Sequence, residues 1–381
     1  MRILISGLIV ILTIVLYIKS THSSIESYLL RGWSNSDHRY RDIPFKTHIR
    51  KIRRPRNPLD LSTMGIFDDI PVEMPDVTDR HTLLQLAQMT SNAYIKQGSD
   101  EWIEPSKHFS GEVISFGWKK DDDGLRGHIF STPDKKTVVI AIKGTSAGLI
   151  GGGGPSSKND KFNDNLLFSC CCARVSWTWT PVCDCYNGGW QCHEECLETS
   201  IEKESVYYPV ATNLYNNVSY MFPDSNIWIT GHSLGGALAS MLGLTFGVPS
   251  VTFEAPGDRL PSQRLHLPQP PAELSGVYHV YHTADPVAEG TCNGMLSPCN
   301  AAGFAMETRC HTGLSIVYDT VSKFGWAVDL RHHRIATVIN EILEHEWKDD
   351  DGVVYVPKPE AEEDCIDCFK WEFGNEKPII V

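Results

Sequence analysis

The chain has 381 residues, of which 41% are hydrophobic and 21% are charged, as in an ordinary globular protein. This composition excludes a disordered chain, a collagen and a coiled coil, and the length allows two domains or one large α/β domain with additional segments. The net charge of −13 argues against nucleic acid as the main partner.

The N-terminus contains an uncharged, mostly aliphatic run at residues 3–18, between Arg2 and Lys19. As a helix, this run is about 24 Å long, which is close enough to the ~30 Å hydrocarbon core of a bilayer to span it with local thinning. We interpret residues 1–18 as an uncleaved transmembrane signal anchor. A cleaved signal peptide and a buried helix are the alternatives, although residues 21–23 form a poor cleavage site.

Residues 19–75 are polar and basic and contain five prolines, and residues 37–56 alone carry a net charge of +6. Such a segment is typical of an extended connection rather than of a core, so we expect a stalk here.

A helical period begins near Thr82, where apolar residues recur on one broad face. Two strands follow at residues 127–131 and 137–143, joined by the turn residues Pro133-Asp134. The second strand is a continuous apolar run, as is typical of a strand buried on both faces.

Twelve cysteines lie in three clusters, which contain seven, three and two members: Cys170, Cys171, Cys172, Cys183, Cys185, Cys192 and Cys196; Cys292, Cys299 and Cys310; Cys365 and Cys368. An even set of this kind after a hydrophobic N-terminus indicates disulfides in an oxidising lumen. The seven members of the first cluster cannot all pair with one another, so at least one bridge must reach another part of the chain. Their spacing does not match a paired zinc finger, so we expect disulfides and no metal. The sequon at Asn217 fits a lumenal, N-glycosylated protein.

From residue 207 strands and helices alternate. We expect strands at residues 226–230, 249–255 and 276–282, a helix at 235–246 and a last helix at 333–346. This order predicts a mostly parallel sheet with helices on its faces. We assign residues 76–350 to one domain with a disulfide-rich insertion at 148–200, and 351–381 to a loosely ordered acidic tail with a Cys365–Cys368 bridge.

The motif Gly231-His232-Ser233-Leu234-Gly235-Gly236 lies between a predicted strand and a predicted helix. In a nucleophile elbow the chain turns so sharply that a Cβ two residues before or after the serine would strike the neighbouring backbone. The motif therefore predicts Ser233 as a nucleophile, whereas the plain alternative is a glycine-rich turn with an incidental serine.

A nucleophilic serine needs an acid and a base, which follow it in the chain in that order when the serine lies in this elbow. Asp285 follows the strand at 276–282, so we expect it to be the acid, and Glu254 is the second candidate. The plain alternative for Asp285 is a structural role as the turn residue before Pro286.

Four histidines follow Asp285 and are candidates for the base. His332 and His333 lie where the last helix begins, His311 adjoins Cys310, and His345 lies deep in that helix, where we expect it to face solvent.

The oxyanion would be bound by the backbone N–H groups of Leu234 and Thr145. Thr145 lies in a loop that leaves the strand at 137–142 abruptly. The alternative interpretation of this loop is an ordinary glycine turn. The glycines at 148–154 lack the ending of a phosphate loop, which argues against nucleotide binding.

The runs 138–145 (VVIAIKGT) and 230–239 (TGHSLGGALA) resemble the two signatures of the class 3 lipases, which are α/β-hydrolases. Four further runs resemble the fungal autophagy lipases that disrupt autophagic bodies in the vacuole: 86–94 (LAQMTSNAY), 170–175 (CCCARV), 252–257 (TFEAPG) and 278–286 (YHVYHTADP). The resemblance covers about residues 80–345.

The resemblance implies an α/β-hydrolase fold with Ser233 as nucleophile, Asp285 as acid and His333 as base, although the neighbouring His332 stays an alternative. It also implies hydrolysis of phospholipids and neutral lipids without a cofactor. A single N-terminal anchor would hold the catalytic domain in the lumen as a type II membrane protein, delivered through the endoplasmic reticulum, Golgi and endosomal or multivesicular membranes to the vacuole. Its targets there would be autophagic and intralumenal vesicles.

Two rival interpretations are a catalytically inactive hydrolase-fold ectodomain that binds a partner protein, and a lumenal serine esterase or peptidase. In the lipase interpretation, residues 148–196 would form a disulfide-stapled cover over an acyl pocket.

Overall fold

The computed structural model describes residues 42–56, 65–119, 124–146, 156–175, 179–204, 207–294, 296–349 and 351–374. The predicted anchor at residues 1–18 and the glycine loop at 148–154 lie outside these residues. Within the described part, every helix is too short or too polar to cross a bilayer.

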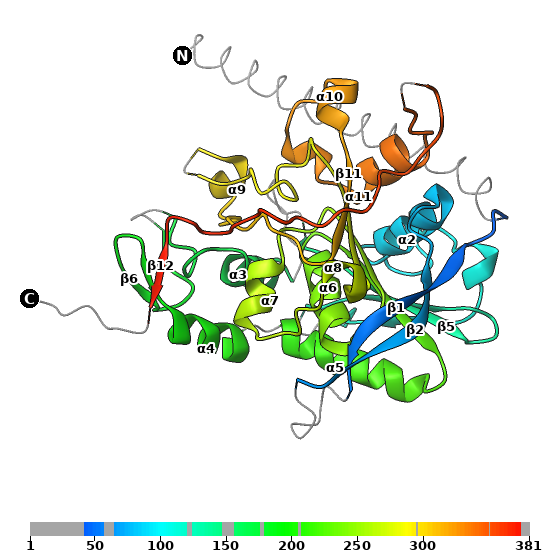
Figure 1. The fold of residues 1–381 in the computed structure, drawn as a ribbon, viewed down its shortest axis with the longest axis horizontal. Helices are drawn as coiled ribbons and strands as arrows, with labels where there is room; N and C mark the ends of the chain where they lie inside the picture. Colours follow the sequence, from blue (N-terminus) through cyan, green and yellow to red (C-terminus); the bar gives the residue numbers. More distant parts are fainter. Residues whose placement is uncertain are drawn as a thin grey trace, which may run out of the picture.

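The elements of the described chain alternate between strands and helices over most of its length (Figure 1). In chain order they are β1 (Thr47–Pro55), β2 (Phe67–Pro75), α2 (Arg80–Asn92), η2 (Lys107–Phe109), β3 (Val113–Phe116), β4 (Gly127–Ser131), β5 (Thr137–Ile142), α3 (Ser157–Leu167), β6 (Tyr186–Gly188), β7 (Gln191–His193), α4 (Glu194–Glu204), α5 (Tyr207–Met221), β8 (Asn226–His232), α6 (Leu234–Phe246), β9 (Ser250–Phe253), α7 (Arg259–Arg264), α8 (Ala272–Ser275), β10 (Val277–His282), α9 (Pro298–Ala301), β11 (Leu314–Tyr318), α10 (Thr320–Phe324), η3 (Leu330–His332), α11 (Ile335–Thr337), η4 (Val338–Leu343) and β12 (Glu372–Gly374).

The central sheet of the described residues has the strand order β11-β10-β9-β8-β5-β4-β3. In this sheet β5, β8, β9, β10 and β11 pair in parallel, whereas β4 pairs antiparallel with both β3 and β5. The predicted mostly parallel sheet is therefore confirmed, but β3 and β11 were not predicted. Both lie at the edges of the sheet, where a short strand leaves a weaker sequence signal.

The two faces of the sheet are covered by different helices. On β5, Val138, Ile140 and Ile142 face the core that contains α6, and Val139 and Ala141 face the core that contains α2. This alternation explains why the sequence of β5 is apolar throughout, because both faces of a central parallel strand are buried.

Of the stalk expected at residues 19–75, the described residues 42–56 and 65–75 are folded instead of extended. β1 and β2 form an antiparallel hairpin, and Ile52 and Met74 are each only 1% exposed. The basic residues that suggested a stalk pair across the hairpin, since Arg53 lies 2.7 Å from Asp69 and is exposed with it. Prolines fit these strands because each strand of an isolated hairpin has a free edge that needs no N–H donor.

The C-terminal segment (residues 351–374) corrects the expectation of a loosely ordered tail with a Cys365–Cys368 bridge. Figure 1 shows this segment crossing the molecule to β12, which pairs with β7. Cys365 is bonded to Cys310, and Cys368 to Cys170. The two cysteines are separated because each follows the path of the segment over a different part of the domain.

The other disulfides connect residues that are close in sequence: Cys171–Cys192, Cys172–Cys183, Cys185–Cys196 and Cys292–Cys299. The expected bridge out of the first cluster is confirmed by Cys170–Cys368. The remaining cysteines of the first cluster are thus all engaged in disulfides and are not available as thiolates.

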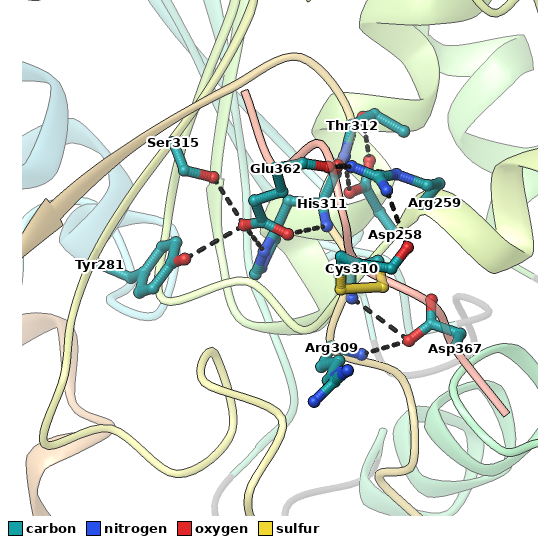
Figure 2. Close-up of a disulfide and its surroundings, with 11 residues drawn as sticks. Asp258, Arg259, Tyr281, Arg309, Cys310, His311, Thr312, Ser315, Glu362 and Asp367 are labelled. Atoms are coloured by element: carbon teal, nitrogen blue, oxygen red, sulfur yellow. Dashed lines mark hydrogen bonds and ion pairs between the residues drawn. A yellow bond between two sulfur atoms is a disulfide. The ribbon is translucent and has the colours of Figure 1, made fainter. Parts of the chain in front are cut away.

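A partly buried ion pair holds the C-terminal segment on the sheet (Figure 2). Glu362 Oε1 lies 2.8 Å from His311 Nδ1 and also accepts hydrogen bonds from Ser315 and Tyr281. Arg259 donates to the backbone oxygens of Glu362 and Cys365. An acidic residue of the tail is thus part of the folded domain.

This pair gives the fold a defined pH dependence. Burial favours the neutral imidazole, but the charge of Glu362 and its hydrogen bond raise the pKa of His311 to about 9. Burial also opposes the charge on Glu362, yet His311 lowers the pKa of that carboxyl to about 2. The pair therefore stabilises the fold fully between the ordinary pKa values of 4.5 and 6.5. The part that depends on Glu362 is lost as pH falls toward 2, and the part that depends on His311 is lost as pH rises through 9.

Glu362→Gln is expected to lower the free energy of unfolding at about pH 6 by about 3 kcal/mol, because it leaves a buried charge without its partner. Urea unfolding of the wild type and the variant across pH measures the difference. The difference should shrink by about pH 10, where His311 is neutral in both proteins; an undiminished difference would contradict the assignment.

Candidate active site

Ser233 lies in the turn between β8 and α6 with φ 57° and ψ −132°, a backbone conformation that is strained for a residue with a side chain. A Cβ on Gly231 would lie 2.2 Å from Gly235 O, and one on Gly235 would lie 2.4 Å from Ile142 O. Both distances are far below van der Waals contact. The sequence prediction that these two positions need glycine is therefore confirmed by the geometry of the turn.

The side chains of Ser233, His333 and Asp285 form one hydrogen-bonded row. His333 Nε2 lies 2.9 Å from Ser233 Oγ, and His333 Nδ1 lies 2.7 Å from Asp285 Oδ2. Asp285 is fully buried after β10, and its other oxygen accepts the N–H of Val287 at 2.9 Å. Burial opposes the charge of Asp285, but His333 lowers the pKa of this carboxyl well below its usual range. When His333 is neutral and carries its proton on Nδ1, its Nε2 is free to accept the proton of the Ser233 hydroxyl.

His333 follows the 3₁₀ turn η3 and precedes a short helix. The continuous helix expected at 333–346 is instead α11 followed by the π-helical segment η4. Because His333 lies before α11, its side chain is free to point toward the elbow, as its loop-edge position had suggested.

His232, inside the elbow motif, holds the backbone of His333. Its Nε2 lies 2.9 Å from His333 O and its Nδ1 lies 2.7 Å from Tyr94 Oη. Since a carbonyl only accepts, Nε2 carries the proton and Nδ1 accepts from the tyrosine. Tyr94 Oη in turn accepts the N–H of Gly144 at 3.0 Å. Burial lowers the pKa of His232 to about 3, so this ring stays neutral and its hydrogen bonds persist.

Sequence reasoning did not assign a role to His232 or Tyr94. The signal for His232 was present, since it lies next to the serine in the motif. Tyr94 lies 138 residues away from His232 in sequence, and only the packing of α2 on β8 brings it near.

The expected oxyanion donors, Leu234 and Thr145, lie on the two segments that flank the elbow. Leu234 is the first residue of α6, so its N–H is not used by the helix. Thr145 follows β5 in the loop next to the elbow, and a Cβ on Gly144 would lie 2.9 Å from Ser233 Cβ. The hydroxyl of Thr145 donates to Asp164 Oδ2 at 2.5 Å. Burial raises the pKa of Asp164 to about 7, although this hydrogen bond acts in the opposite direction. The Thr145 hydroxyl is thus engaged away from Ser233.

The other candidate bases do not contact Ser233 in this arrangement. His311 directs Nδ1 to Glu362 and Nε2 to Ala255 O. His332 stacks on Trp326 with ring centroids 4.7 Å apart, and His345 is exposed. The structure therefore brings His333, and not its neighbour His332, to the serine.

The second candidate acid, Glu254, neighbours Asp285, and it is Asp285 that His333 Nδ1 meets. The sequon residue Asn217 is exposed on α5.

Comparison with known proteins places these features in a family. The sequence profile described as Lipase (class 3) matches residues 168–291, which include Ser233 and Asp285. A relative from Cryptococcus neoformans var. neoformans serotype D (strain B-3501A), named as a lipase ATG15, is 50% identical over 366 residues, which cover 81% of this chain and 70% of the relative. A lipase ATG15 of Mycosarcoma maydis is 46% identical over 374 residues, covering 83% of this chain and 70% of the relative.

Among solved structures, the nonglycosylated LIP2 lipase of Yarrowia lipolytica is 17% identical, with a TM-score of 0.35 over 62% of this chain and 78% of that chain. This structural likeness is too low to support the assignment, which rests on the sequence relatives. Identity near one half over most of both chains shows the family, as the resemblance had predicted. The chain belongs to the ATG15 family of class 3 lipases, which are serine hydrolases of carboxylic esters.

Proposed function

We propose that this protein is a lumenal, membrane-anchored lipase and phospholipase that hydrolyses the acyl esters of membrane lipids with Ser233, His333 and Asp285. The observation that carries the proposal is the hydrogen-bonded row from Ser233 Oγ through His333 to the buried Asp285. This arrangement supplies a nucleophile, a base and a group that orients the base.

In the first half-reaction, Ser233 Oγ attacks the ester carbonyl carbon while His333 Nε2 takes the hydroxyl proton. The resulting imidazolium is stabilised by the ionised Asp285 on Nδ1. The backbone N–H groups of Leu234 and Thr145 bind the oxyanion of the tetrahedral intermediate. When the intermediate collapses, His333 returns the proton to the leaving lipid alcohol and the acyl group stays on Ser233.

In the second half-reaction, His333 takes a proton from water, and the resulting hydroxide attacks the acyl carbon. Collapse of the second intermediate releases the fatty acid and restores the Ser233 hydroxyl. The proposal requires no cofactor, because protein groups carry each proton.

The membrane and cellular parts of the proposal rest on the sequence and on the family name. Residues 1–18 would anchor the protein as a single-pass type II membrane protein, with residues 19–46 connecting the anchor to the folded part. N-glycosylation at the exposed Asn217 and the disulfides are consistent with a lumenal route. Autophagic-body and multivesicular-body membranes in the vacuole would be the targets.

Release of fatty acid from phosphatidylserine vesicles, compared with hydrolysis of a soluble short-chain ester, tests the proposal. We expect vesicle lipid to be the better substrate by kcat/KM. Hydrolysis of the soluble ester alone would indicate an esterase, and the absence of both activities and of fluorophosphonate labelling would indicate an inactive ectodomain.

Single replacements of the two adjacent histidines test which is the base. His333→Gln is expected to lower kcat by about 10³-fold or more, since Ser233 loses its proton acceptor. His332→Gln should change kcat by less than about threefold, because its ring packs on Trp326 and not on Ser233. Ester hydrolysis by the two purified variants measures the difference, and a larger loss in His332→Gln would reverse the assignment.

A further inference from the structure

A second buried carboxyl, Glu254, lies beside Asp285. Glu254 follows β9 and Asp285 follows β10, and these two strands are parallel neighbours in the sheet. The carboxyl ends of adjacent parallel strands meet at one edge, which brings both side chains together. Each residue is fully buried, and the two carboxyl groups are neighbours that influence each other's ionisation.

Glu254 has no other strong partner for its charge. Within the described residues, neither oxygen makes a well-formed hydrogen bond, and the backbone N–H of His282 is the donor that favours its charge. His282 Nε2 lies 3.7 Å from Oε1, but it points its proton at His332 O, 3.2 Å away. Burial lowers the pKa of His282 to about 4, so this ring is not a cation that would balance Glu254. The remaining acidic neighbour, Glu289, offers no positive charge either, and where it is ionised it disfavours a charge on Glu254.

The backbone of Glu254 is also held in an unusual conformation. Its φ of 46° lies in the left-handed region, which is strained for a residue with a side chain. Its N–H donates to Val280 O at 3.0 Å, which fixes this turn at the end of β9. The strained residue is thus the one whose carboxyl neighbours Asp285.

Two carboxyl groups that share a buried hydrogen bond cannot both be ionised, because one of them must supply the proton. Asp285 accepts hydrogen bonds from His333 and from the N–H of Val287, and both favour its charged form. Glu254 has only the backbone N–H of His282 near its carboxyl, without a well-formed hydrogen bond, so the proton belongs to Glu254.

We propose that Glu254 is a positioning residue that is kept as a neutral carboxylic acid and donates its O–H to Asp285. This proposal rests on the proposed function of Ser233, His333 and Asp285 and extends their row by a fourth member. The donated hydrogen bond, together with the N–H of Val287, fixes the Asp285 carboxylate with Oδ2 toward His333. Glu254 touches neither substrate nor the reacting atoms and acts only through Asp285.

Two substitutions separate a donor from a space-filling residue. Glu254→Met keeps the volume and removes the donor, and is expected to lower kcat on vesicle lipid by about 30- to 100-fold with KM within twofold. Glu254→Gln keeps an N–H donor and should lose only about two- to fivefold. Glu307→Gln is a matched control. This glutamate is partly buried, but it accepts the N–H of Cys170 and does not neighbour Asp285.

Infrared spectroscopy reads the proton directly and does not depend on activity. The wild-type minus Glu254→Gln difference spectrum at about pH 6 should contain the C=O band of a protonated carboxylic acid. This measurement also decides the question if Glu254→Met does not fold.

The proposal is overturned if that band is absent, if Glu254→Gln loses as much kcat as Asp285→Asn, or if folded Glu254→Met has wild-type kcat. A wild-type protein that hydrolyses no ester would instead refute the proposed function, and the infrared band would still report the state of Glu254.

Discussion

Replacing Ser233 with alanine is expected to lower kcat for lipid ester hydrolysis by about 10⁴- to 10⁶-fold, because the acyl-enzyme can no longer form. The folded state should be almost unaffected, since the hydroxyl is removed from a row in which His333 keeps its bond to Asp285. Asp285→Asn should cost about 10⁴-fold, because an amide would favour the wrong imidazole tautomer. Steady-state hydrolysis of phosphatidylserine vesicles and labelling by a fluorophosphonate probe measure both effects.

Ser240→Ala is the matched control for Ser233→Ala. Ser240 is a fully buried serine of α6, the helix that Ser233 precedes, and it donates to Asp258 rather than to a histidine. We expect this variant to lose stability while it keeps kcat within about twofold and still reacts with the probe. Residual hydrolysis above about 1% of wild type in Ser233→Ala would show that another residue is the nucleophile.

Removing the Cys170–Cys368 disulfide is expected to cause the largest loss of stability of any single bridge. Its cysteines are 198 residues apart, and the chain-entropy relation gives about 5 kcal/mol for a loop of that length. This is a large share of the roughly 5–15 kcal/mol that a domain usually has. The double variant Cys170→Ser/Cys368→Ser, unfolded in urea beside the wild type, measures the loss.

The short bridge Cys292–Cys299 provides the comparison. It spans 7 residues, for which the same relation gives about 2.5 kcal/mol. We expect Cys292→Ser/Cys299→Ser to lose about half as much stability as the long-range variant. Equal losses in the two double variants would show that loop length does not govern the contribution of the bridges.

Much of the central fold could be predicted from the sequence because its signals are local. The strand at β5 is a buried apolar run, and α6 follows a motif whose glycines are required by contacts within a few ångströms of the turn. Chain order after the serine also singled out Asp285 and the pair His332 and His333. The segments that were predicted wrongly, β1 with β2 and the C-terminal segment, have charged sequences that hide their buried residues.

The sequence alone determined the elbow at Ser233, the parallel core and the family, because a sharp turn and a buried strand restrict which residues can occupy each position. Only the tertiary structure decided that His333 rather than His332 reaches Ser233, that Cys365 bonds to Cys310, and that Glu254 lies under Asp285. Such pairings join residues tens to hundreds of positions apart. They depend on the order of the strands and the paths of the loops, and no short stretch of sequence encodes the distance between two such residues.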